Sequence, residues 1–298
     1  MNDRTCNNQL TIPLYQMNDL YFNKTNTCIE ENHVIFTRYL YDKYSVSCSF
    51  ILSLLDNQID QSLFWGYELY YSGFTSETMD MVMYIYEVFY KKHNLTFTKF
   101  IREKMNEWKL DNSKHCMLAT IIRNMLNLKS CYSNENSEQS TVVKKPIKII
   151  YLDNDIAKYK TKECYHDNMR PNWRFLSKVC IYPIYNIEDH PYSDLFDTNS
   201  NKKISEKIIG IKPTNKWVLL QLWLYHWEYY SAKSPIWKNR IEDNGGILNH
   251  ETKQINFNSD ESLEKYYEKY GYEPDEQSNE TERTCIGVCT NDFIQTTV

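Results

Sequence analysis

Three carboxylates near the C-terminal end of the chain have side chains that could do chemistry. Glu273, Asp275 and Glu276 surround Pro274, and closely spaced carboxylates can bind a hard cation or transfer protons. A calcium loop would also need alternating oxygen ligands and a glycine, which this segment lacks. We therefore interpret the cluster as a solvated turn, with cation binding and acid–base chemistry as the alternative.

Imidazole and thiol groups are the next candidates. His226 lies between Tyr225 and Trp227 in an apolar run. It could act there as a base or a metal ligand, but a core histidine with one hydrogen bond is the commoner case. Cys164 and His166 are close in sequence, although a catalytic dyad is normally assembled across the fold. No spacing joins these groups to three further histidines, His115, His190 and His250.

The nine cysteines do not form a recognisable metal site. No CxxC pair occurs, and Cys285 with Cys289 lacks a second pair at zinc-site spacing, so we expect reduced, structural cysteines. The sequence also lacks a phosphate-binding glycine loop, a GxSxG elbow, an HExxH zinc motif and a kinase signature. We therefore expect a protein that is not an enzyme and has no catalytic, cofactor-binding or metal-binding residues.

One short linear motif lies near the N-terminus. Tyr15, Leu20 and Tyr21 match the pattern Tyr-x-x-x-x-Leu-Φ, where Φ is apolar. Scaffolds and repressors use this peptide to dock on the cap-binding translation initiation factor. A short helix would present the three side chains on one face to a groove of the partner. We predict them as a partner-binding site, and the alternative is a segment that packs back on the helical domain.

The elements that would position these groups are helical in the first half. Residues 1–32 are polar and interrupted by Pro13, which predicts a flexible arm. Residues 33–130 form a predicted helical domain, because apolar and aromatic side chains recur there at three- and four-residue spacing. We expect five helices in a bundle or in stacked hairpins. They begin at Val34, near residue 61, at Ser76, at Thr96 and at Ser113, and Ser72 with Gly73 closes the second.

The second half mixes helix and strand signals. Residues 131–145 are of low complexity and predict a linker, and residues 146–275 predict an α+β domain. Its expected elements are strands at 147–152 and 178–182, a buried helix at 216–227, and a hairpin in which residues 243–246 connect strands at 239–241 and 246–248, followed by a strand at 254–257 and a helix at 263–270. Residues 276–298 predict a polar tail. The expected fold class is mainly α, with an α+β region in the second half.

Charge and hydropathy narrow the class of partner. The formal net charge of −5 over 298 residues disfavours non-specific binding to a phosphate backbone. The basic segments at 144–148 and 202–203 are short, so direct RNA contact stays open. No apolar run reaches the roughly 20 residues that span a bilayer, and the first nine residues lack the features of a signal peptide. We expect a cytosolic protein that does not contact membranes.

Two motifs carry a family resemblance. Residues 63–74 read LFWGYELYYSGF and residues 270–277 read YGYEPDEQ. In both, the chain resembles a family of proteins encoded by nucleocytoplasmic large DNA viruses of the giant, mimivirus-like kind. A composition rich in Tyr, Asn, Lys and Ile agrees with an AT-rich genome of this kind. The resemblance brings no catalytic residues. It implies, for some members, the scaffold subunit of a viral cap-binding translation initiation complex.

The resulting hypothesis is a non-enzymatic interaction scaffold that bridges a cap-binding subunit and a helicase in the viral factory of the host cytoplasm. The alternative is a virion-packaged or transcription-associated structural protein. An enzyme of unrecognised type is a third possibility, and it would need a pocket with converging polar groups around His226 or Cys164.

Overall fold

We describe residues 33–91, 95–130, 176, 180–196 and 208–292 of a computed structural model of the chain. The described chain is mainly helical and contains one two-stranded sheet, which confirms the expected fold class. The first half consists of α3 (Lys43–Leu55), α4 (Ile59–Tyr71), α5 (Thr75–Ile85), the π-helical turn η2 (Tyr86–Tyr90), α6 (Phe97–Leu110) and α7 (Cys116–Ser130). The arm at 1–32, the linker at 131–145 and the strand predicted at 147–152 lie outside the described residues.

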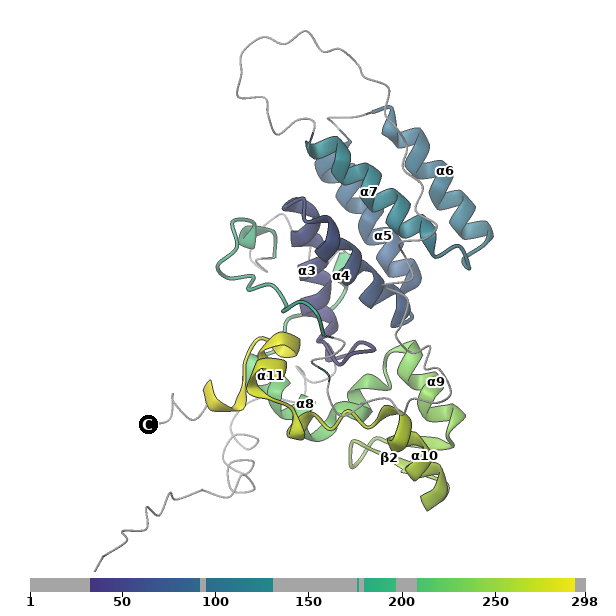
Figure 1. Cartoon of the computed structure of the whole chain (residues 1–298), viewed down its shortest axis with the longest axis vertical. Coiled ribbons are helices and arrows are strands. Elements are labelled where there is room, and N and C mark those ends of the chain that lie inside the picture. Colours follow the sequence, from purple (N-terminus) through teal and green to yellow (C-terminus); the bar gives the residue numbers. More distant parts are fainter. Residues whose placement is uncertain (1–32, 92–94, 131–175, 177–179, 197–207, 293–298) are drawn as a thin grey trace, which may run out of the picture.

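The second half contains the 3-10 turn η5 (Ser193–Leu195), α8 (Lys216–Ser231), α9 (Pro235–Asp243), β1 (Gly246–Asn249), β2 (Gln254–Phe257), α10 (Asp260–Tyr270), the 3-10 turn η7 (Pro274–Glu276) and α11 (Asn279–Ile286). Helices α5, α6 and α7 lie at one end of the molecule and α8 to α11 at the other, with α3 and α4 between them (Figure 1). One cluster of buried hydrophobic side chains runs through both halves of the described chain. No helix in these ranges is long and apolar enough to cross a bilayer.

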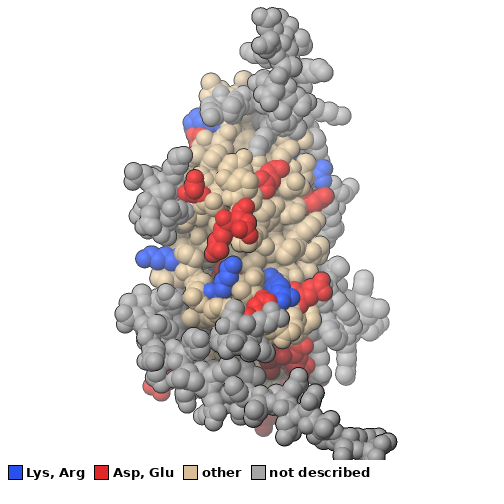
Figure 2. Space-filling view, turned by 90° about the vertical axis from the view of Figure 1, so that its left-hand side faces the viewer, with Lys and Arg blue, Asp and Glu red and all other residues tan. Residues whose placement is uncertain are grey.

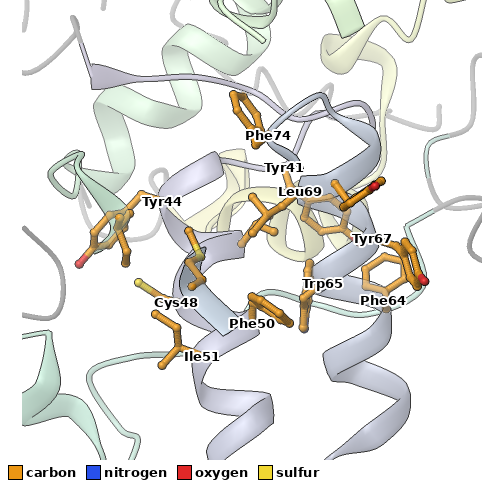
Figure 3. Close-up of a cluster of buried hydrophobic side chains, with 14 of the residues drawn as sticks. Tyr41, Tyr44, Cys48, Phe50, Ile51, Phe64, Trp65, Tyr67, Leu69 and Phe74 are labelled. Atoms are coloured by element: carbon orange, nitrogen blue, oxygen red, sulfur yellow. The ribbon is translucent and has the colours of Figure 1, made fainter. Parts of the chain in front are cut away.

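Helix α3 is buried on nearly every side because it lies at the centre of this arrangement. It packs closely against α4, since a Cβ atom on Gly66 would lie 2.9 Å from Phe50 Cε2. Figure 3 shows Phe50 beside Trp65 in this interface. The serines of α3 tolerate burial because their hydroxyls donate to carbonyls of the preceding turn, as Ser47 does to Lys43 O at 2.8 Å.

The first predicted helix begins later than expected. Residues 34–42 form a tight turn, in which Phe36 pairs with Asp42 and Leu40 has a φ of +60°. The carboxylate of Asp42 accepts a hydrogen bond from Ser45 N at 2.9 Å and so caps α3. Apolar spacing before residue 43 was therefore wrong as a helix signal, because those side chains are buried by residues of the second half. We call residues 34–42 the hub turn.

The predicted hairpin has a different first strand. Residues 239–241 belong to α9, which ends at Asp243, and Gly245 has a φ of +73°. Strand β1 pairs antiparallel with β2, so that Gly246 lies opposite Phe257 and Asn249 opposite Gln254. The strand predicted at 254–257 is confirmed. Residues 180–182, the described part of the strand predicted at 178–182, do not form a strand.

The polar tail predicted from residue 276 contains a helix instead. Ser278 caps α11 by accepting a hydrogen bond from Thr281 N at 3.2 Å, and Gly287, with a φ of +80°, ends it. Cys285, Ile286 and Cys289 are buried, and α11 packs on α8. The segment that forms α11 is polar in composition because only one short face of this helix is buried against the rest of the protein.

A buried ion pair holds the hub turn on α4. Arg38 Nε lies 2.8 Å from Glu68 Oε2, and the two side chains are 3% and 0% exposed. The other oxygen of Glu68 accepts from Tyr39 N at 3.2 Å, and Ser72 Oγ accepts from Arg38 N at 2.9 Å. Burial has the largest single effect and would lower the pKa of Arg38, but Glu68, with smaller contributions from Tyr39 and Tyr71, outweighs it, and the pKa is raised.

Tryptophans of the second half bind the same turn. Trp223 Nε1 of α8 donates to Leu40 O at 2.8 Å, and Trp237 Nε1 of α9 donates to Thr37 O at 2.9 Å. The Tyr41 hydroxyl donates to Tyr182 O at 2.8 Å. The hub turn is therefore the place where the two halves are joined.

Glu68→Gln is expected to lower the free energy of unfolding by about 3–5 kcal/mol, because it leaves the charge of Arg38 buried without its counter-ion. Urea denaturation followed by circular dichroism measures this change. The control is Glu103→Gln, whose partner Lys99 is 85% exposed and which should change the free energy by less than about 1 kcal/mol. Equal effects of the two substitutions would contradict the central role of the Arg38–Glu68 pair.

Candidate functional site

The helix that contains His226 is kinked at this residue and packs against the turn that carries the C-terminal carboxylates. His226 has a non-helical backbone conformation, with φ −136° and ψ 20°, inside this otherwise regular helix. The turn η7, which carries Asp275 and Glu276, packs on α8. The helix of His226 and the carboxylate turn therefore lie side by side, although about 50 residues of chain separate them.

Hydrogen bonds to the backbone hold the turn that carries these carboxylates in one conformation. Glu273 is half-buried and has a left-handed φ of +42°, and Glu276 N donates to its carbonyl at 3.0 Å. The side-chain amide of Gln277 donates to Tyr272 O at 2.6 Å and so closes the turn. Asp275 and Glu276 are exposed to solvent. The turn thus presents two solvated carboxylates next to α8.

The carboxyl of this region with the largest pKa shift is Glu228, which was not among the residues predicted from the sequence. Glu228 follows the kink by two residues, and burial raises its pKa from 4.5 to about 7, although a hydrogen bond with Tyr267 opposes the shift. Its Oε1 atom is buried and has no hydrogen-bond partner. Burial also raises the pKa of the Tyr267 hydroxyl, and the charge of Glu228 adds to that effect. Glu228 therefore exchanges its proton near neutral pH.

Tyr225 and Glu282 complete the surroundings of the kink. Partial burial raises the pKa of Tyr225, and the charges of Asp275 and Glu282 raise it further. Glu282 itself accepts hydrogen bonds from Thr290 N at 2.6 Å and Thr290 Oγ1 at 3.2 Å, which fix the chain after α11. We call Tyr225, Glu228, Tyr267, Asp275 and Glu282 the kink cluster.

The kink cluster can hold and exchange protons. A carboxyl with a pKa near neutrality is the kind of group that general acid–base catalysis uses. Burial in a helix interface gives the same shift without catalysis. No three His, Cys, Asp or Glu side chains in the described ranges come close enough together to coordinate a metal ion.

His190 forms a second carboxylate contact that sequence spacing did not predict. Its Nε2 lies 2.9 Å from Asp56 Oδ2, and its Nδ1 accepts from Tyr192 N at 3.2 Å. The pattern places the ring proton on Nε2, so Nε2 attaches residues 184–192 to the end of α3, whereas Nδ1 stabilises the turn at 190–192. Tyr185 N, which donates to Ser49 Oγ at 2.9 Å, strengthens this attachment.

The other histidine candidates also make packing contacts. The His115 ring stacks on Tyr71 with centroids 5.4 Å apart, and its carbonyl accepts from the Tyr67 hydroxyl at 2.8 Å. His250 Nδ1 lies 2.9 Å from the Tyr229 hydroxyl at the surface. The remaining sequence candidates lie outside the described residues: Tyr15, Leu20, Tyr21, Cys164, His166 and the basic segments at 144–148 and 202–203.

Two buried thiols meet beside the hub turn. Cys180 Sγ lies 3.5 Å from Cys285 Sγ, and Cys180 Sγ also lies 3.6 Å from Tyr39 O. No local sequence signal could have found this pair, because the two cysteines are separated by 105 positions. For Glu228 a signal existed, since it follows Trp227 in a helix that is apolar nearly all round.

Glu228→Gln is expected to stabilise the protein at pH 8 by up to about 3 kcal/mol and to have little effect at pH 5. The folded state holds the Glu228 proton more tightly than the unfolded state does. The wild-type protein therefore loses stability as pH rises from about 4.5 to about 7, and glutamine removes that loss.

The measurement is urea unfolding of both proteins at pH 5, 6, 7 and 8. Glu264→Gln is the matched control, because Glu264 is exposed on the neighbouring helix α10. A difference between Glu228→Gln and wild type that stays constant across these pH values would show that Glu228 ionises normally in the folded protein.

Comparisons with known proteins identify no relative from which the role of these residues could be inferred. No protein-family model, no curated protein and no solved structure matches the chain.

Proposed function

We propose that this chain is a non-enzymatic protein–protein interaction scaffold that supports viral translation initiation by bridging a cap-binding subunit and a helicase. Tyr15, Leu20 and Tyr21 of the arm would contact the cap-binding subunit. The helical half would contact the other partner. The proposal rests on the linear motif and the family resemblance for the identity of the partners.

The hub turn is the structural observation that supports a scaffold. A bridging protein must hold its binding surfaces at a fixed separation. The hub turn does this through the buried Arg38–Glu68 pair on one side and the indole hydrogen bonds of Trp223 and Trp237 on the other. Since the buried core is continuous across the turn, the helical hairpins and the second half have one fixed relative position.

The use of the chemically competent side chains also favours this function. His190 uses Nε2 to attach its segment to the end of α3 and Nδ1 to stabilise a local turn, and Glu282 fixes the chain after α11. His115 stacks within the α4–α7 interface. In these cases a group suited to chemistry stabilises the fold.

Surface charge supports a protein partner more than a nucleic acid. On the face shown in Figure 2, Asp and Glu side chains gather near the middle, and Lys and Arg side chains lie among and around them. Together with the net charge of −5, such a mixed face offers little attraction to a phosphate backbone. Charged surfaces of mixed sign are suited to selecting protein partners.

Affinity purification of the tagged full-length protein from infected cells tests the proposal. We expect a cap-binding protein and a helicase to be recovered, and their recovery to survive nuclease treatment, because the contacts are between proteins. The double substitution Tyr15→Ala/Leu20→Ala should abolish recovery of the cap-binding protein, since it removes two anchors from one face of the docking helix.

Asn18→Ala is the matched control, because Asn18 occupies a variable position of the same motif and should leave recovery unchanged. Recovery of capsid or polymerase subunits in place of the two expected proteins would refute the scaffold proposal and favour the virion-packaged or transcription-associated alternative.

A further inference from the structure

The thiol pair at Cys180 and Cys285 joins two segments that are already held together. Ile184 N donates to Thr284 O at 3.1 Å, so residues 180–187 run beside α11. A Cβ atom on Gly287 would lie 3.1 Å from Ile184 Cδ1, which shows that the Ile184 side chain packs directly on Gly287. The two sulfur atoms, 3.5 Å apart, are in van der Waals contact within this arrangement.

We propose that Cys180 and Cys285 are a site of reversible oxidation, at which a two-electron oxidant such as hydrogen peroxide produces a disulfide bond. This inference does not depend on the proposed scaffold function. A disulfide requires an S–S distance of about 2.05 Å, so the sulfurs must approach by about 1.5 Å. Rotation of the two side chains about their Cα–Cβ bonds is the motion that brings them together.

The two thiols differ in access to solvent, which assigns their order of reaction. Cys180 is 7% exposed and Cys285 is fully buried. Burial raises the pKa of the Cys285 thiol well above its usual value, which makes it the poorer first nucleophile. Cys180 therefore meets the oxidant first.

The reaction balances in two steps. In the first, Cys180 Sγ attacks one peroxide oxygen, the O–O bond breaks, and a sulfenic acid and one water form. In the second, Cys285 Sγ attacks the sulfenic sulfur. The S–O bond breaks, and the departing hydroxyl takes the Cys285 proton and leaves as a second water. The two thiols lose two electrons in total, and the peroxide gains them.

The bond would lock the C-terminal helix α11 to the segment that begins at Cys180, next to the hub turn. Tyr39 O lies 3.6 Å from Cys180 Sγ and 4.0 Å from Cys285 Sγ, so the disulfide would form directly against the turn that joins the two halves. It would also close a long loop of chain, which restricts the unfolded state. Oxidation is therefore expected to stabilise the fold and to be reversed by a dithiol.

Peptide mapping of the full-length protein tests the proposal. The folded protein is treated with hydrogen peroxide, alkylated under denaturing conditions and digested with trypsin, and the linked peptides are sequenced by mass spectrometry. The peptide that begins at Thr284 contains both Cys285 and Cys289. Cys289→Ser is therefore the matched control, because Cys289 is also buried and lies four residues further along the chain, just after α11 ends.

We expect a linked species lighter by two hydrogens that joins Cys180 to Cys285, that is lost in Cys180→Ser and Cys285→Ser, and that persists in Cys289→Ser. The urea midpoint should rise on oxidation of the wild type and fall back after treatment with dithiothreitol. The proposal is overturned if Cys180 pairs with Cys289, or if both thiols are fully alkylated after peroxide treatment that oxidises other cysteines. The mapping of the wild-type protein decides between these results even if a serine variant does not fold.

Discussion

The ion pair between Arg38 and Glu68 is the interaction on which the rest of the structure depends. Both charges lie in the core, where an isolated charge would be very unfavourable, and the pair is tolerable because the two charges neutralise each other and both carboxylate oxygens of Glu68 accept hydrogen bonds. Glu68 accepts from Arg38 and from the backbone of Tyr39, and the guanidinium lies 4.5 Å from the centroid of the Tyr39 ring. Such a pair favours one arrangement of α4 and the hub turn over nearby alternatives, since a small displacement would leave a buried charge unsatisfied.

Backbone carbonyls of the hub turn hold the second half in a fixed position relative to this ion pair. Thr37 O and Leu40 O, which a helix would have used internally, accept hydrogen bonds from Trp237 and Trp223. The indole rings then pack against their own surroundings, as Trp237 does edge-on against Trp227 with ring centroids 5.4 Å apart. A turn whose backbone carbonyls accept hydrogen bonds from distant side chains therefore connects the halves more specifically than apolar packing alone could, because hydrogen bonds are directional.

The kink cluster and the thiol pair both lie where the C-terminal chain is attached to the rest of the fold. Turn η7 and α11 both pack on α8, while Glu282 of α11 accepts from Thr290 N and Cys285 contacts Cys180. Burial there raises the pKa values of Glu228 and Cys285. Both groups would thus link the attachment of the C-terminal helix to a solution condition, pH for the carboxyl and oxidant for the thiols.

The sequence by itself determined the mainly helical fold, most helix positions and several helix ends. These depend on local chemistry: apolar spacing placed α4 and α6, Ser72 and Gly73 closed α4, and a helix was expected at 263–270, within α10. The tertiary structure decided that residues 34–42 are a turn, that residues 239–241 are helical and that the predicted tail contains α11. It also decided the two contacts that matter most for chemistry, Glu228 in its buried interface and Cys180 against Cys285. Each of these features depends on contacts between groups that are distant in the chain. The spacing of residues within a short segment cannot reveal such contacts.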